Sequence, residues 1–129
     1  MDDLYRENIL DHYENPRNYG TLESPDFSYR DFNPLCGDEI QIDLRMADGK
    51  VDQVGFEGKG CAISLASASM LTEIVEGMSL ADLRYLGKED LLESLGIPLS
   101  PMRLKCALLP LKALKAGVYG LKGWPGEEE

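Results

Sequence analysis

The chain has 129 residues, of which 43% are hydrophobic and 28% charged, a composition typical of a soluble globular protein. Its 13 basic and 23 acidic residues give a formal net charge of −10, which argues against binding nucleic acid through the phosphates. No apolar run approaches the roughly 20 residues of a membrane span, and no apolar signal region follows the N-terminus. We therefore expect one domain over residues 1–129, no membrane partner and a cytoplasmic location.

The first predicted element is a helix over residues 3–14, where apolar residues recur at helical spacing. Pro16 restricts the residue before it to extended conformations and ends this helix. The only histidine, His12, lies on it, and a lone helical histidine more often has a hydrogen-bonded structural role than a ligand role. Residues 19–26 contain Gly, Ser and Pro and are predicted to form a loop.

Three strands are predicted next, over residues 27–32, 40–46 and 51–57. Apolar and polar residues alternate from Ile40 to Met46, which indicates a half-buried strand. Asp48-Gly49 is a hairpin signal between the second and third strands. The pattern predicts a small antiparallel sheet of three strands joined in sequence order.

Helices are predicted to follow the sheet, over residues 62–76, 80–86, 88–95 and from 101 onward. The first is rich in Ala and Ser, so it can pack close to the sheet. The last begins with Ser100 as cap and Pro101 at its first position, and Pro110 is expected to kink or split it. The tail Gly123–Glu129 is expected to be frayed. The fold class is therefore α+β, with a small three-stranded antiparallel sheet packed against several helices.

The three cysteines, Cys36, Cys61 and Cys106, each precede Gly or Ala, so no bulky neighbour crowds the sulfur. Asp38 adds an oxygen donor two residues after Cys36. Three thiols and one carboxylate have the number and type for one four-coordinate metal centre. The alternative is three unrelated cysteines buried as small apolar residues.

The spacing of the cysteines limits the class of site. No Cys-x-x-Cys pair is present, which excludes a zinc finger or a thioredoxin-like redox pair. An odd number of cysteines without a secretion signal suits reduced thiols rather than a disulfide framework. The donors come from three separate elements, so the site would form only in the folded domain.

Basic residues surround the third cysteine. Residues 101–126 contain five Lys or Arg and no acid, and Arg103 and Lys105 flank Cys106. These cations are expected to favour the Cys106 thiolate, and the start of the helix over residues 62–76 is expected to do the same for Cys61.

Four motifs carry a resemblance to a known family, and they occur in one order along the chain: Asp11-His12-Tyr13 with Asn15-Pro16-Arg17-Asn18; Asn33-Pro34 with Cys36-Gly37-Asp38; Gly60-Cys61-Ala62-Ile63-Ser64 with Ala66-Ser67; and Lys105-Cys106-Ala107. Together they resemble the U-type iron–sulfur cluster assembly proteins: IscU, SufU and the N-terminal domain of NifU. The match runs from about residue 4 to residue 117, and the ligand motifs are most similar to SufU.

The resemblance implies a SufE/NifU-like fold in which Cys36, Asp38, Cys61 and Cys106 ring one exposed site. In the family that site holds Zn²⁺ or a nascent [2Fe–2S] cluster, and thiolate ligands suit both. Sulfur arrives as a persulfide from a cysteine desulfurase of the IscS or SufS type, and finished clusters pass to acceptor proteins. We expect Cys106 or Cys61 to accept the persulfide, with Cys106 favoured.

Some positions depart from the IscU pattern. IscU proteins have a histidine directly before the third cysteine, whereas this chain has Lys105 there, as SufU proteins do. Lys105 could pair with Asp38 or with the charge of a cluster. The segment Leu99–Arg103 is a degraded match to the chaperone-docking motif of IscU, which argues against an Hsp70-type partner. The 44 residues between Cys61 and Cys106 are fewer than SufU proteins usually have. The open functions are a cluster scaffold, a zinc-dependent sulfurtransferase, and a metal-binding module without a transfer role.

Overall fold

The computed structural model describes residues 2–34, 37–120 and 124. The elements follow in the order α1 (Asp2–Glu14), β1 (Phe27–Asn33), β2 (Asp38–Ala47), β3 (Lys50–Lys59), α2 (Ala62–Val75), α3 (Leu80–Tyr85), α4 (Lys88–Leu95) and α5 (Pro101–Tyr119). The strands form one antiparallel sheet in the order β1-β2-β3. The predicted α+β class, the three-stranded sheet and the helices after it are therefore confirmed.

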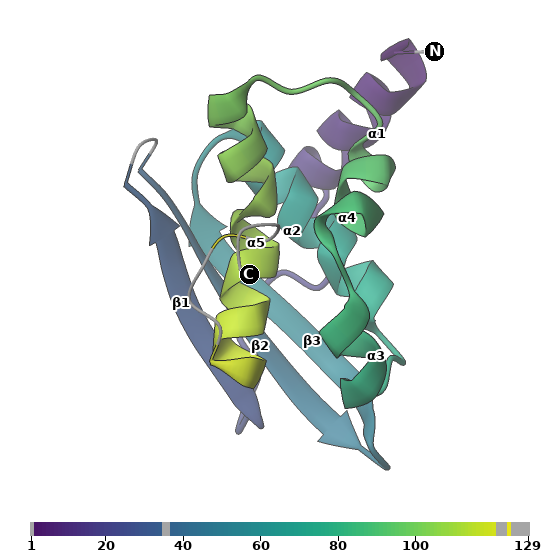
Figure 1. Cartoon of the computed structure of the whole chain (residues 1–129), viewed down its shortest axis with the longest axis vertical. Coiled ribbons are helices and arrows are strands. Elements are labelled where there is room, and N and C mark those ends of the chain that lie inside the picture. The colour runs from purple at the N-terminus through teal and green to yellow at the C-terminus, as the bar shows by residue number, and fades with distance from the viewer. Residues whose placement is uncertain (1, 35–36, 121–123, 125–129) are drawn as a thin grey trace.

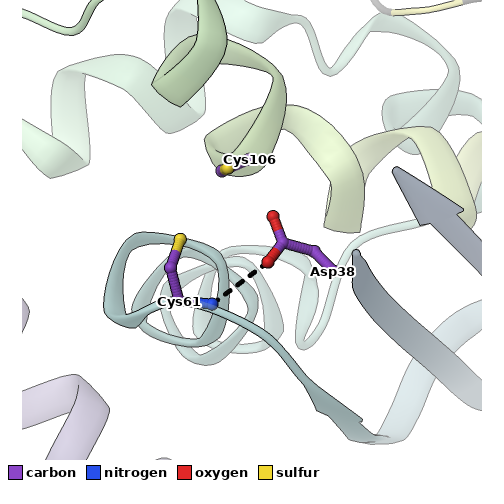
Figure 2. A group of neighbouring side chains, drawn as sticks. All are labelled: Asp38, Cys61 and Cys106. Carbon is purple, nitrogen blue, oxygen red and sulfur yellow. Dashed lines mark hydrogen bonds between the residues drawn. The ribbon is translucent and has the colours of Figure 1, made fainter. Parts of the chain in front are cut away.

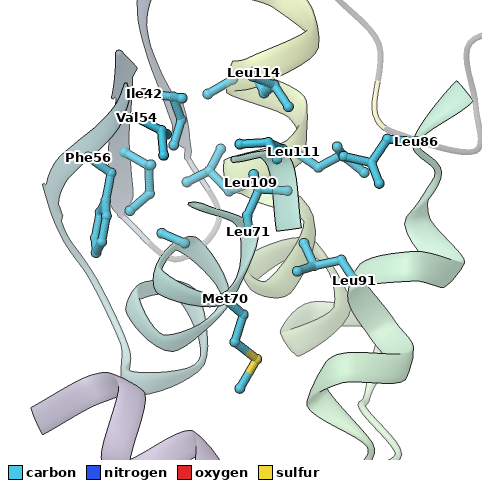
Figure 3. Close-up of a cluster of buried hydrophobic side chains, with 14 of the residues drawn as sticks. Ile42, Val54, Phe56, Met70, Leu71, Leu86, Leu91, Leu109, Leu111 and Leu114 are labelled. Carbon is cyan, nitrogen blue, oxygen red and sulfur yellow. The ribbon is translucent and has the colours of Figure 1, made fainter. Parts of the chain in front are cut away.

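The helices gather on one face of the sheet (Figure 1). α5 lies against β1 and β2, while α2 lies against β3 and packs on both α1 and α5. Apolar side chains of the sheet and helices form one core between these layers (Figure 3), which includes Ile42, Phe56, Leu71 and Leu109. The alternation in β2 places Ile40, Ile42 and Leu44 in this core and so explains the strand pattern.

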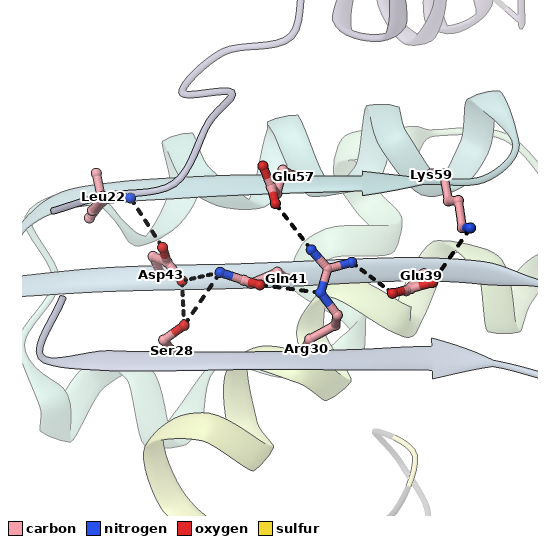
Figure 4. Close-up of polar contacts among 8 residues, drawn as sticks. All are labelled: Leu22, Ser28, Arg30, Glu39, Gln41, Asp43, Glu57 and Lys59. Carbon is pink, nitrogen blue, oxygen red and sulfur yellow. Dashed lines mark hydrogen bonds and ion pairs between the residues drawn. The ribbon is translucent and has the colours of Figure 1, made fainter. Parts of the chain in front are cut away.

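Polar contacts cover the other face of the sheet (Figure 4). The guanidinium of Arg30 on β1 donates to Glu39 on β2 at 2.8 Å and to Glu57 on β3 at 3.1 Å. The buried carboxylate of Asp43 accepts from the Ser28 hydroxyl at 2.6 Å and from the Leu22 N–H at 3.1 Å. These contacts join all three strands and the loop before β1, and they leave the helical face to form the core.

α2 is the central helix, and small residues make up most of its buried face. Ser64, Ala66, Ser67 and Ala68 are fully buried. The Ser67 hydroxyl donates to the carbonyl oxygen of Ala107 on α5 at 2.6 Å. Because these side chains are short, α2 approaches the sheet and α5 closely, as the composition predicted.

α5 runs without interruption through Pro110, so of the two expected effects, a kink or a split, the split does not occur. A proline inside a helix removes one backbone hydrogen bond and crowds the preceding turn. Pro110 is buried together with Leu109 and Leu111 against α2 and the sheet. Tertiary packing supplies most of the stability of a helix in a protein, and here it offsets the local cost.

The N-terminal motif ties α1 to α2. His12 is buried, and its Nδ1 lies 2.7 Å from the hydroxyl oxygen of Ser69, which also accepts from the Arg17 N–H at 2.8 Å. Burial and the nearby Arg17 lower the pKa of His12 below its usual value. His12 thus has the hydrogen-bonded structural environment expected for it. Within the described ranges, no helix is both long and apolar enough to cross a membrane.

Candidate metal centre

Three of the four predicted donors meet at one end of the sheet (Figure 2). One carboxylate oxygen of Asp38 and the sulfur atoms of Cys61 and Cys106 all lie within 4.8 Å of one another. Asp38 begins β2, Cys61 immediately precedes α2, and Cys106 lies in the second turn of α5. The fourth predicted donor, Cys36, lies outside the described residues.

Asp38 has one satisfied carboxylate oxygen and one unsatisfied oxygen. The side chain is 1% exposed, and its Oδ1 accepts a hydrogen bond from the Cys61 N–H at 3.1 Å. The other oxygen, Oδ2, is buried and has no hydrogen-bond partner among the residues that the structure describes. A buried carboxylate oxygen without a partner is costly, and a bound cation would offset that cost.

Glycines let the segment before Cys61 approach Asp38. A Cβ atom added at Gly60 would lie 2.5 Å from Asp38 Oδ1, and one at Gly58 would collide with the carbonyl oxygen of Glu39. This role of Gly60 was not found from the sequence, although Gly58-Lys59-Gly60 stands directly before Cys61. The signal is the position of this run directly before a candidate ligand, since a glycine there permits close approach of another chain segment.

The two described thiols differ in exposure and share one cation. Cys106 is fully buried, whereas Cys61 is partly exposed. The guanidinium of Arg103 interacts with both. Cys61 has the larger effect and Cys106 the smaller, and both raise the pKa of Arg103 above its ordinary value. Arg103 is therefore one of the cations near Cys106 that the sequence predicted.

Lys105 has a different environment from Arg103. Its Nζ lies over the indole of Trp124, 4.7 Å from the ring centroid. Among the residues that the structure describes, Lys105 forms no ion pair with Asp38. Trp124 itself packs against the core, which corrects the expectation of a frayed tail at this residue.

The donors fit both kinds of metal centre that the sequence suggested. Thiolates are preferred ligands of Zn²⁺ and of iron–sulfur clusters, and a carboxylate oxygen is also a zinc ligand. A bound cation would satisfy the buried Oδ2 of Asp38, so this oxygen fits a metal-ligand role. His12 lies elsewhere, between α1 and α2, and does not belong to this donor group.

Comparisons with known proteins agree with the fold. The model of the NifU-like N terminal domain matches residues 4–127, and the chain belongs to this family. The zinc-dependent sulfurtransferase SufU of Bacillus subtilis is 41% identical, with 95% of each chain covered. The iron–sulfur cluster assembly scaffold protein IscU of Haemophilus influenzae is 34% identical, with 95% of this chain and 98% of the relative covered.

Solved structures give the same picture. A Fervidobacterium islandicum protein, described as an iron–sulfur cluster assembly scaffold for the SUF system, superposes with a TM-score of 0.73. It is 27% identical, with 87% of this chain and 94% of the other covered. The description of this solved protein names iron–sulfur cluster assembly, as the name of the Haemophilus influenzae relative does.

The alignments also show in which respects the chain is similar to SufU and in which to IscU. The alignment with SufU spans 141 positions, more than the 129 residues of this chain, so the relative contains residues without a counterpart here. The alignment with IscU spans 126 positions. The chain is therefore more similar to SufU in identity and to IscU in length.

Proposed function

We propose that this chain is an iron–sulfur cluster assembly scaffold that builds a [2Fe–2S] cluster on Cys36, Asp38, Cys61 and Cys106 and passes it to acceptor proteins. The observation that carries the proposal is the convergence of one carboxylate and two thiols, from three elements, within 4.8 Å. The family relationship supports the same function. The chain would act as a single domain over residues 1–129 and in the cytoplasm.

Sulfur would arrive from a cysteine desulfurase by thiol–persulfide exchange. A thiolate of the scaffold attacks the terminal sulfur of the donor persulfide, the sulfur–sulfur bond of the donor breaks, and the donor cysteine leaves as a thiolate. Cys106 was favoured as acceptor from its basic neighbours. Its complete burial and the partial exposure of Cys61 support Cys61 as the first acceptor instead.

Release of the cluster would begin at Asp38. A carboxylate is a harder and more weakly matched ligand for an iron–sulfur centre than a thiolate is. Asp38→Ala is expected to make an assembled cluster persist longer and transfer more slowly. Faster loss from the variant, with an unchanged circular dichroism spectrum, would show that Asp38 protects the cluster.

The test is anaerobic reconstitution with ferrous iron, cysteine, a cysteine desulfurase and a thiol reductant that helps to reduce the persulfide sulfur to sulfide, followed by addition of an apo-ferredoxin. The wild-type protein should develop the visible absorbance of a [2Fe–2S] cluster and lose it to the acceptor. Each of Cys36→Ser, Cys61→Ser and Cys106→Ser should reduce the cluster content. Unchanged content in all three variants would locate the site elsewhere.

The alternative is a zinc-dependent sulfurtransferase that accepts persulfide from a SufS-type desulfurase. The specific observation in its favour is the 41% identity to the Bacillus subtilis protein of that name. Lys105 in place of histidine favours it as well. Protein purified without oxygen decides between the two: a colourless protein with about one Zn²⁺ per chain that stimulates the desulfurase supports the transferase.

A further inference from the structure

A tryptophan near the C-terminus lies between two lysines of α5. The Nζ of Lys105 is 4.7 Å from the centroid of the Trp124 ring, and the Nζ of Lys112 is 5.2 Å from it. Both distances are within the range of cation–π contacts. One indole therefore contacts the ammonium groups of both lysines.

One side of this arrangement is anchored to the sheet. Lys112 forms an ion pair with Asp31 on β1, with 2.6 Å between Nζ and Oδ2. Their side chains are only 14% and 13% exposed, so the pair is largely shielded from water. Trp124 also packs against the core. The indole is therefore held in place independently of Lys105.

Lys105 is adjacent in sequence to Cys106, whose sulfur lies within 4.8 Å of an Asp38 carboxylate oxygen. That carboxylate has a buried oxygen, Oδ2, without a partner. An ammonium group on a flexible four-carbon stem is an ordinary partner for such an oxygen. Yet the Nζ of Lys105 lies on Trp124, and Asp38 Oδ2 stays unpaired.

We propose that Trp124 is a positioning residue that holds the ammonium group of Lys105 away from Asp38. In this arrangement the ammonium group of Lys105, the residue next to Cys106, is engaged by the indole, and the Asp38 carboxylate stays open to a metal ion. Trp124 touches neither the metal nor any transferred group. The inference rests on the metal centre of the proposed function and adds the residue that keeps one of its ligands free.

The experiment measures the Zn²⁺ dissociation constant of metal-free protein by competition with a chromophoric chelator. Trp124→Leu keeps an apolar side chain and removes the aromatic face, so Lys105 is released. Zn²⁺ binding is expected to weaken on the order of three- to tenfold, the equivalent of one cation–π contact. Adding Lys105→Met to Trp124→Leu removes the competitor and should restore the wild-type affinity.

Tyr119 provides a matched control at the other end of α5. Its ring lies 5.7 Å from the guanidinium carbon of Arg84, and its hydroxyl donates to the carbonyl oxygen of Leu80. Tyr119→Leu removes a cation–π contact of the same class without releasing a cation next to Cys106. Its Zn²⁺ affinity should equal that of the wild type.

Each outcome has a definite meaning. Unchanged affinity in Trp124→Leu overturns the inference, as does a weakening that Lys105→Met does not reverse or that Tyr119→Leu reproduces. If Trp124→Leu fails to fold, Trp124→Phe, with its weaker cation–π face, takes its place and should give a smaller weakening that Lys105→Met reverses. Absence of Zn²⁺ binding by the wild type contradicts the metal centre itself, whereas equal binding by wild type and Trp124→Leu contradicts this inference alone.

Discussion

Asp38 Oδ1 accepts a hydrogen bond from the backbone N–H of Cys61 at 3.1 Å, so one predicted donor fixes the backbone of another. An aspartate directly after Gly37 can act as a metal ligand or as a cap for the turn at that glycine. The observed bond is a third role, since it joins β2 to the residue that precedes α2. Oδ2 remains the oxygen available to a metal ion.

The first prediction follows from these two oxygens. In metal-free protein, Asp38→Ala removes a hydrogen bond to a charged group, worth about 1.5–3 kcal/mol, but also removes a buried unpaired charge that costs several kcal/mol. We expect the metal-free variant to be at least as stable as the wild type. Zn²⁺ should raise the melting temperature of the wild type more than that of the variant.

The measurement is thermal unfolding with and without Zn²⁺, with Asp38→Asn as the matched variant, because its amide oxygen can still accept from Cys61. A large loss of stability in metal-free Asp38→Ala would show that the bond to Cys61 outweighs the buried charge. That result would make Asp38 chiefly structural.

The second prediction concerns Gly60. A Cβ atom at this position would lie 2.5 Å from Asp38 Oδ1 and must displace the carboxylate. Gly60→Ala is expected to weaken Zn²⁺ binding by about 10- to 100-fold, as changes behind a metal ligand typically do. The chelator competition described above measures it.

Gly49 provides the control for this substitution. It has a φ of +77°, and a Cβ atom there would meet nothing within 4 Å. Gly49→Ala should lower stability through its left-handed backbone while leaving Zn²⁺ affinity unchanged. Equal affinities of Gly60→Ala and Gly49→Ala would contradict the steric argument.

The third prediction concerns the cation beside the thiols. Cys61, and after it Cys106, raise the pKa of Arg103, so the guanidinium is placed to interact with both sulfur atoms. Arg103→Met is expected to slow alkylation of the metal-free thiols severalfold at neutral pH and low salt. Mass spectrometry of iodoacetamide adducts over time gives the rate for each cysteine.

Arg103→Lys keeps a positive charge and should retain part of the wild-type rate. High salt should reduce the difference in alkylation rate between the wild type and Arg103→Met, because salt screens exposed charges. A rate that is insensitive to both the substitution and the salt concentration would rule out an electrostatic role for Arg103.

The fourth prediction is a pH dependence of stability. The pKa of His12 is lowered by burial and by Arg17, so the folded state prefers the neutral imidazole. Between the folded pKa and about 6.5, the unfolded chain binds more protons, and stability rises with pH. The contribution is complete above about pH 6.5 and is lost as the pH falls below it.

Urea unfolding of wild type and His12→Gln between pH 5 and pH 8 tests this prediction. The wild type should lose more stability than the variant on acidification from pH 7 to pH 5. Parallel curves for the two proteins would assign the acid sensitivity to the carboxylates instead.

Local signals were enough to predict most of the fold. The alternation from Ile40 to Met46 and the Asp48-Gly49 turn specify β2 and the hairpin, because each depends on neighbouring residues alone. The helix cap at Ser100 is likewise local, and its hydroxyl accepts from the Arg103 N–H at 3.3 Å.

Features that depend on tertiary contacts could not be predicted in this way. Proline is locally unfavourable inside a helix, yet α5 continues through Pro110. The buried position of Pro110, which is a tertiary feature, explains this. The convergence of Asp38, Cys61 and Cys106 is a property of how three elements pack. The spacing of the cysteines suggested a shared metal site only as a hypothesis. The resemblance to the family motifs then named the four residues of that site. The contact between Trp124 and Lys105 had no local signal at all.

The small residues of α2 have a consequence for the geometry of ligand binding. Ser67 joins α2 to the backbone of Ala107, next to Cys106, and Ala66 and Ala68 have no side-chain rotamers. The separation between the two cysteine-bearing segments is thus set by short side chains and by the Ser67 hydrogen bond. Few core rotamers can change the distance between the backbones of Cys61 and Cys106, which favours a constant geometry for the two sulfur ligands.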